Sequence, residues 1–119
     1  MMRVLGRRAQ DATAARLAVD VTAYALKVSA QDVIEGGRGS ADVAMARRVA
    51  MYLCHVAFEL SLQRVAEAFA RDRSTVAYAC HTIEDRRDDP RFDAWIASLE
   101  MTLRTAPPPT LSVPAERGP

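Results

Sequence analysis

Polar side chains that could contact nucleic acid gather in one short stretch of the sequence, and they are Arg71, Arg73, Ser74, Thr75 and Tyr78. Arginine presents a planar fork of donors that matches a phosphate or the major-groove edge of guanine. If a helix begins at this point, its N-terminal residues can enter a major groove, and its free N–H groups suit a phosphate. We therefore predict that Arg73, Ser74, Thr75 and Tyr78 can reach base edges in a major groove.

The residues around this cluster predict the two helices that would position it. Ser61 is typical of a helix N-cap, and an apolar pattern follows from Leu62 to Phe69. After a short break, a second helix is predicted from about Ser74 to Asp85. A helix-turn-helix needs a small residue where the helices cross and a tight turn between them, which Ala66 and Ala70 supply. The wedge between the helices is filled by Val65, Phe69 and Val76. An ordinary pair of packed helices is the alternative, but it leaves the arginine and hydroxyl cluster unexplained.

The whole chain is predicted to be all-α. It has 119 residues, of which 50% are hydrophobic and only 6% aromatic, so it suits one helical domain. We divide it into a flexible N-terminus (1–10), a folded domain (11–104) and a disordered, proline-rich tail (105–119). The domain is a compact bundle of about six helices. They are expected at about 11–27, after Ser29, at 41–59, 62–69 and 74–85, and from Pro90 with Asp89 as cap.

Composition narrows the function class only partly. The 16 basic residues nearly balance the 15 acidic ones, so net charge neither implies nor excludes a nucleic-acid partner. No segment approaches the ~20 apolar residues of a membrane span. The first residues carry positive charge but lack the apolar core of a signal peptide. A cytoplasmic location, associated with the nucleoid, is therefore expected, with no membrane partner.

Several motifs together resemble the C-terminal DNA-binding domain of the bacterial replication initiator DnaA. They are Val43-Ala-Met-Ala-Arg-Arg-Val-Ala-Met-Tyr-Leu, Ser61-Leu, Ala68-Phe, Arg71-Asp-Arg-Ser-Thr-Val and Ala79-Cys-His-Thr-Ile-Glu. The resemblance extends from about Ala15 to Leu103. The family's Asp-His-Thr-Thr-Val signature appears here as Asp72-Arg73-Ser74-Thr75-Val76. The implied fold is that domain's Trp-repressor-like helix-turn-helix bundle.

The resemblance also implies how such a domain reads double-stranded DNA. In the family, a recognition helix enters the major groove of a nine-base-pair box, and an arginine from a basic loop enters the adjacent minor groove. Asp72 would begin the recognition helix, and Arg73, Ser74 and Thr75 would face bases. The residues expected to bind phosphate are Arg38, Arg47, Arg48, Arg64 and Arg71.

The sequence also departs from the family. The loop that should be basic contains Gly36-Gly-Arg-Gly-Ser, with Arg38 its one basic residue, and Met45 stands where we place the minor-groove arginine. Met45→Arg is therefore expected to tighten binding beside A·T-rich flanks. Arg73 replaces the signature histidine and could hold guanine with two hydrogen bonds. No Walker motif is present, so no ATPase activity is expected.

Other residues suggest weaker alternatives. Cys54-His55 and Cys80-His81 could suggest zinc, but neighbouring helix residues point about 100° apart, so no metal and no cofactor are expected. Tyr78, His81 and Glu84 share a helical spacing without a recognisable catalytic arrangement, so the protein is not expected to be an enzyme.

The leading prediction is therefore sequence-specific binding of double-stranded DNA in transcriptional regulation or control of replication initiation. A homodimer or another regulatory protein is a further possible partner. The competing hypothesis is a protein-interaction adaptor that keeps the fold but not the DNA-binding face.

Overall fold

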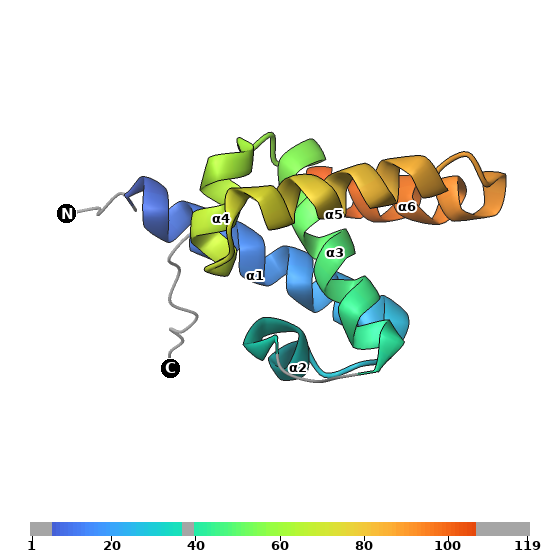
Figure 1. Cartoon of the computed structure of the whole chain (residues 1–119), viewed down its shortest axis with the longest axis horizontal. Coiled ribbons are helices and arrows are strands. Elements are labelled where there is room, and N and C mark those ends of the chain that lie inside the picture. Colours follow the sequence, from blue (N-terminus) through green and yellow to red (C-terminus); the bar gives the residue numbers. More distant parts are fainter. Residues whose placement is uncertain (1–5, 37–39, 107–119) are drawn as a thin grey trace, which may run out of the picture.

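The computed structural model describes residues 6–36 and 40–106, and in this part of the chain all regular structure is helical (Figure 1). The fold is therefore all-α, as predicted. The six helices are α1 (Arg7–Leu26), α2 (Ala30–Glu35), α3 (Ala41–Val56), α4 (Leu62–Phe69), α5 (Arg73–Arg86) and α6 (Pro90–Arg104). None of these helices has the length and apolar character needed to cross a bilayer.

Most helix boundaries follow the capping residues in the sequence. The hydroxyls of Ser29, Ser40 and Ser61 each accept a hydrogen bond from a backbone N–H in the first turn of α2, α3 and α4. Such a bond satisfies one of the donors that a helix N-terminus leaves free. Asp89 caps α6 in the same way, with Pro90 at the first helical position.

Two boundaries differ from the sequence-based expectation. Helix α1 begins at Arg7, so residues 7–10, predicted as part of a flexible N-terminus, are helical. Helix α3 ends at Val56 and not at Glu59, because Glu59 has a left-handed backbone (φ 59°) that no helix continues. The rest of the predicted N-terminus (1–5) and most of the predicted tail (107–119) lie outside the described residues.

Helix α3 occupies the centre of the bundle. Its Val49, Ala50 and Leu53 are completely buried. Helix α1 packs along it through small side chains, including Ala18, which lets the two backbones approach closely. On the other side, α5 contributes the buried side chains of Val76, Ala79 and Ile83. This arrangement holds the N-terminal end of α5 beside α3, with α4 crossing next to it (Figure 1).

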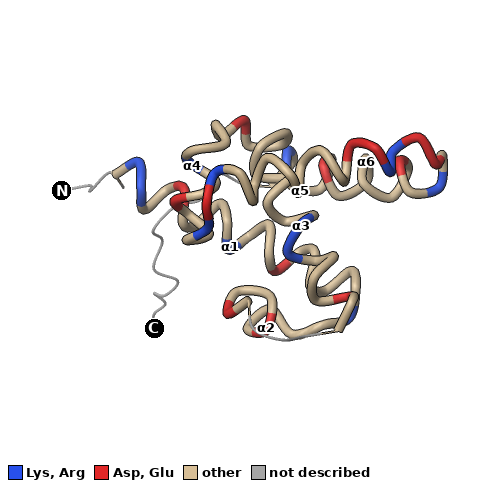
Figure 2. Tube along the Cα trace, in the orientation of Figure 1, with Lys and Arg blue, Asp and Glu red and all other residues tan. Residues whose placement is uncertain are grey.

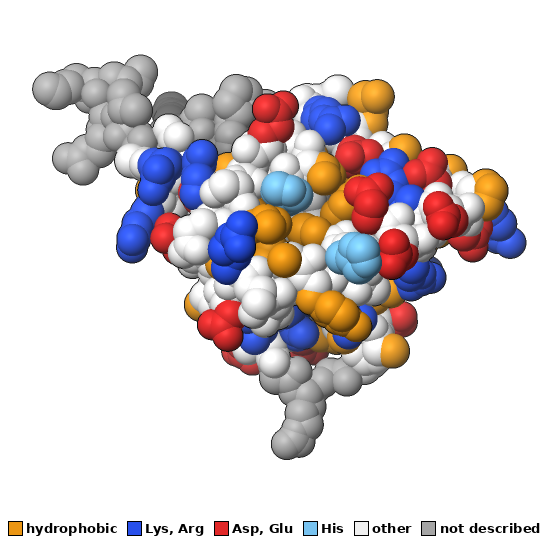
Figure 3. Space-filling model, turned by 45° about the horizontal axis from the view of Figure 1, so that its top comes forward, with side chains coloured by type: hydrophobic (Ala, Val, Ile, Leu, Met, Phe, Trp, Pro, Cys, Tyr) orange, Lys and Arg blue, Asp and Glu red, His pale blue; other side chains and the backbone are white. Residues whose placement is uncertain are grey.

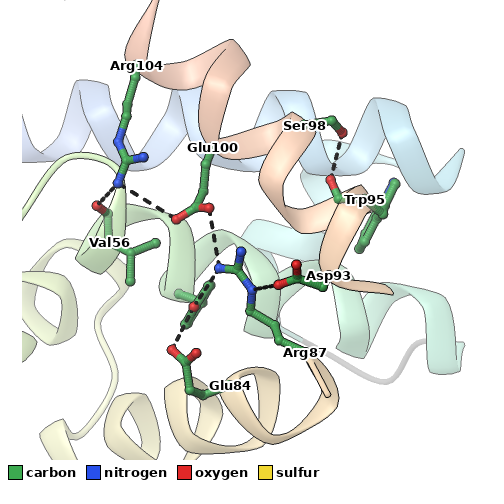
Figure 4. A network of polar contacts seen from close by, with 9 residues as sticks. Val56, Glu84, Arg87, Asp93, Trp95, Ser98, Glu100 and Arg104 are labelled. Atoms are coloured by element: carbon green, nitrogen blue, oxygen red, sulfur yellow. Dashed lines mark hydrogen bonds and ion pairs between the residues drawn. The ribbon is translucent and has the colours of Figure 1, made fainter. Parts of the chain in front are cut away.

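Helix α6 is held by a polar network as well as by apolar contacts (Figure 4). The Tyr52 hydroxyl, on α3, donates to Glu84 Oε2 (2.8 Å) and accepts from Arg87 Nη1 (3.0 Å). Arg87 also pairs with Asp93 and Glu100 of α6. Burial raises the pKa of Tyr52 to about 12, so its hydroxyl keeps its proton at neutral pH. The network therefore joins α3, the end of α5 and α6.

Candidate nucleic-acid interface

Helices α4 and α5 form the helix-turn-helix that the sequence predicts. Ala66, which the sequence places at the crossing of the two helices, is buried, with 3% of its surface exposed. Ala70 has a left-handed backbone (φ 54°), and the next residue, Arg71, donates its N–H to the Ala66 carbonyl (2.9 Å). The left-handed residue and the hydrogen bond that follows it end α4 and reverse the chain within a few residues.

The four predicted base-reading residues lie together at the N-terminal end of α5. Arg73, Ser74, Thr75 and Tyr78 are all exposed, and the Tyr78 side chain remains 67% exposed despite its size. The opposite side of the helix is buried against the core, so these residues share the outward side. Asp72 is the N-cap, as expected for the start of the recognition helix, but its carboxylate makes no capping hydrogen bond.

A cationic hollow lies beside this end of α5, and three arginines line it. Arg47 and Arg48 come from α3, and Arg71 comes from the turn between α4 and α5 (Figure 2). Thr75 and Tyr78 form the side that belongs to α5. The hollow has a volume of about 220 Å³, and we call it the arginine hollow. The fold thus brings together three of the five predicted phosphate ligands and two of the predicted base readers.

The arginines of the hollow have no carboxylate partner in the part of the chain that the structure describes. Arg47, Arg48 and Arg71 form no ion pair with any residue in the described ranges. Arg47 Nε donates to the Val33 carbonyl (3.1 Å), while its Nη2 is buried and has no hydrogen-bond partner there. Burial lowers the pKa of Arg47, and the nearby charges of Arg71 and Arg48 lower it further. An anion in the hollow would offset this repulsion between the arginines.

The other two predicted phosphate ligands are placed differently. Arg64 forms a two-fold hydrogen bond with buried Asp11, from Nε to Oδ2 (2.9 Å) and from Nη2 to Oδ1 (2.7 Å). That contact raises the pKa of Arg64 and joins α4 to α1. Its guanidinium is therefore already occupied by a carboxylate. Arg38 lies outside the described residues.

Met45 does not line the arginine hollow. It contributes to a separate depression, whose lining includes Phe92 and Trp95, and its Sδ lies 3.8 Å from Arg86 Nη1. Arg86 also lies over the Phe92 ring, 4.3 Å from its centroid. The structure thus places Met45 in contact with the α5–α6 end of the bundle, away from the end of α5 that carries the predicted base readers. The sequence-based expectation that Met45 occupies a groove-facing position is not supported by this packing.

The cysteine and histidine residues do not converge on a common point. Burial raises the pKa of Cys54 to about 12 and that of Cys80 to about 11, which keeps both thiols protonated. His55 Nδ1 donates to the Leu60 carbonyl (2.7 Å), and His81 faces Asp85 on the exposed side of α5. Across residues 6–36 and 40–106, no three His, Cys, Asp or Glu side chains gather as metal ligands do.

Comparison with known proteins supports the helix-turn-helix assignment. A family model described as bacterial DnaA protein helix-turn-helix matches residues 16–83, more than half of the chain. The chromosomal replication initiator DnaA of Tropheryma whipplei (strain Twist) is 36% identical over 67 residues, covering 56% of this chain. Chromosomal replication initiator DnaA 1 of Chlamydia trachomatis serovar D is 35% identical over 88 residues, covering 72% of this chain.

Solved structures agree with the sequence matches. A crystal structure of a DNA replication initiation factor superposes with a TM-score of 0.71 at 27% identity, over 80% of this chain and 29% of that one. The replication initiator DnaA bound to AMPPCP and single-stranded DNA gives a TM-score of 0.69 at 26% identity, over 79% of this chain and 28% of that one.

The matched region is one domain of much longer relatives. The chain spans 14% of the Tropheryma protein and 19% of the Chlamydia protein. The shared part contains α2 to α4, most of α5 and the larger part of α1, and hence the described residues of the arginine hollow. The chain therefore belongs to the bacterial DnaA helix-turn-helix family.

Proposed function

We propose that this protein binds double-stranded DNA in a sequence-specific way and acts in transcriptional regulation or in control of replication initiation. The arginine hollow is the observation that supports this most directly. Three guanidinium groups that form no ion pair among the described residues lie beside the exposed N-terminal end of α5, in a family whose full-length members are named as replication initiators. A protein with this role would work in the cytoplasm, on the nucleoid.

In the proposed complex, the N-terminal end of α5 enters the major groove. Arg73 can hold O6 and N7 of a guanine with two hydrogen bonds, while Ser74 and Thr75 reach neighbouring base edges. Arg48 and Arg71 then lie beside the entry point, where the DNA backbone passes, and bind phosphates. Phosphate contacts orient the protein and provide most of the salt-dependent affinity.

We further propose that binding requires no ATP hydrolysis by this domain. The printed sequence contains no Gly-x-x-x-x-Gly-Lys-Ser/Thr motif. Its only dense glycine run, Gly36-Gly-Arg-Gly-Ser, lacks the lysine that would contact nucleotide phosphates. A single domain with a handful of phosphate contacts should bind DNA moderately, so a pair of sites occupied by two copies is a natural arrangement.

Selection from a random duplex pool tests the proposal, followed by affinity measurements over a series of salt concentrations. A defined motif should be recovered. The slope of log affinity against log salt should be roughly −3 if only the three arginines of the hollow contact phosphate, and roughly −5 if all five predicted ligands do. If no duplex binds even at low salt, the DNA-binding proposal is wrong. The adaptor hypothesis, which the near-zero net charge favours, would then replace it.

A further inference from the structure

The short helix α2 contacts two arginines of the hollow although it lies outside the helix-turn-helix. The last carbonyl groups of a helix have no partner within that helix. One of them, the carbonyl of Val33, accepts from Arg47 Nε at 3.1 Å. Because Val33 itself is buried (1% exposed), this acceptor is firmly placed, and it holds the Arg47 guanidinium at one orientation.

The residue that ends α2, Gly36, is in contact with the second arginine. A Cβ atom added to Gly36 would lie 1.8 Å from Arg71 Nη2 and 2.9 Å from Arg71 Cζ, so the Arg71 guanidinium, the far end of a flexible side chain, would have to move. The Arg71 guanidinium therefore occupies the space that any other residue type at position 36 would fill. Gly36 also has φ +70°, a backbone conformation that glycine adopts without strain.

We propose that the last turn of α2 is a positioning element for the phosphate-binding arginines, with Val33 orienting Arg47 and Gly36 leaving the space in which Arg71 lies. This proposal rests on the proposed function, since it concerns how the same DNA face is built. It assigns Gly36 a specific role, that of a positioning residue, in addition to ending a helix. The residue sets the strength of DNA binding through Arg71 and needs no contact with DNA itself.

The proposal makes the effects of Gly36 and Arg71 dependent on one another. Gly36→Ala must push the Arg71 guanidinium out of its place, so it should weaken binding in the same way as Arg71→Ala. Each variant loses one phosphate contact, and the salt slope becomes shallower by about one unit. The affinity deficit relative to the unchanged protein then differs by about 3.5-fold between roughly 50 and 200 mM salt.

Fluorescence anisotropy with a short labelled duplex of random sequence measures this effect with the full chain. The double variant Gly36→Ala/Arg71→Ala should bind no more weakly than Arg71→Ala alone. Gly36→Asn is the second variant, because asparagine accepts a left-handed backbone more readily than alanine but still carries a Cβ. It should show the same shallower slope. Gly6→Ala is the matched control, since among the described residues no atom outside its immediate chain neighbours lies within 4 Å of the added Cβ, and its slope should be unchanged.

Circular dichroism at the assay temperature establishes that each variant is folded. Wild-type slopes in both Gly36→Ala and Gly36→Asn would overturn the proposal, because Arg71 would then bind phosphate from another position. A further loss of affinity in the double variant, as large as that of Gly36→Ala alone, would overturn it as well, because Gly36 would then act independently of Arg71. If the unchanged protein binds no duplex, it is the proposed function that fails, and the two failures are thus distinguishable.

Discussion

The arginines at the two ends of α5 differ in whether a carboxylate pairs with them. At the N-terminal end, Arg48, Arg71 and Arg73 have no carboxylate partner among the residues that the structure describes. At the C-terminal end, Arg87 is bound by Asp93 and Glu100, and its side chain is only 19% exposed. Arg104 on α6 is likewise paired with Glu100 and donates to the Val56 carbonyl (2.9 Å).

The distribution of carboxylates explains this difference. On the face shown in Figure 3, acidic side chains gather mainly over the α5–α6 end. The sequence has the same asymmetry, since four of the six residues of Glu84-Asp-Arg-Arg-Asp-Asp89 are acidic. A net charge of +1 therefore conceals a cationic end and an acidic end, and only the first can attract a polyanion.

The largest effect is expected at Arg87, which tests whether the paired arginines at the C-terminal end of α5 stabilise the fold. Arg87→Ala should reduce the free energy of unfolding by about 3 kcal/mol, because it leaves the largely buried Glu100 without its closest partner and removes a donor from Tyr52. Affinity for DNA should be unchanged. Urea denaturation measures the loss, and Arg91→Ala, on the exposed surface of the same end, is the control that should change stability by under about 0.5 kcal/mol. An Arg87→Ala protein of normal stability would contradict a structural role for this end.

The Arg64→Ala variant tests whether an arginine that is paired with a carboxylate still contributes to DNA binding. Arg64→Ala should cost about 2 kcal/mol of stability, because Asp11 is buried and loses its partner. Arg16→Ala breaks an exposed pair with Asp20 and should cost only about 0.3–0.5 kcal/mol. If folded Arg64→Ala also binds DNA with a shallower salt slope, Arg64 contacts phosphate as the sequence predicted, and the division proposed here is wrong.

At the cationic end, Arg73 and Arg71 should contribute to DNA binding in different ways, Arg73 to sequence preference and Arg71 to affinity for any sequence. Arg73→Ala should weaken binding to the best site by roughly 1–3 kcal/mol and relax the preference at one base pair. Arg71→Ala should weaken all sequences about equally and lower the salt slope by about one. Competition between the selected site and single-base variants distinguishes the two. Equal losses on every sequence from both substitutions would show that Arg73 reads no base.

The smallest effect is expected at Met45. Because Met45 packs beside Arg86, Phe92 and Trp95, Met45→Arg should leave DNA affinity and flank preference unchanged. A stability loss of up to about 1 kcal/mol is expected, from apolar packing that is lost and from a second charge beside Arg86. Anisotropy with A·T-flanked and G·C-flanked duplexes is the measurement. Tighter binding to the A·T-flanked duplex would contradict this prediction and support the expectation, drawn from the sequence, that position 45 faces the minor groove.

Local patterns in the sequence were enough to predict the helices and the helix-turn-helix. A serine cap, a small residue at the crossing and a break before Arg73 act over a few positions, so they can be recognised without a fold. The predictions were wrong where a boundary had no local marker. The start of α1 at Arg7 and the end of α3 before Glu59 are examples, because tertiary packing sets helix ends as much as propensity does.

The sequence by itself determined the all-α class, the family and the exposed positions at the start of α5, since each follows from residue types at fixed spacings. Only the tertiary structure decided which arginines have partners within the protein. The partners of Arg64 and Arg47 are Asp11 and the Val33 carbonyl, at sequence separations of 53 and 14 residues. An arginine's availability depends on whether a carboxylate or carbonyl lies within hydrogen-bonding distance, and chain folding alone brings such distant groups together.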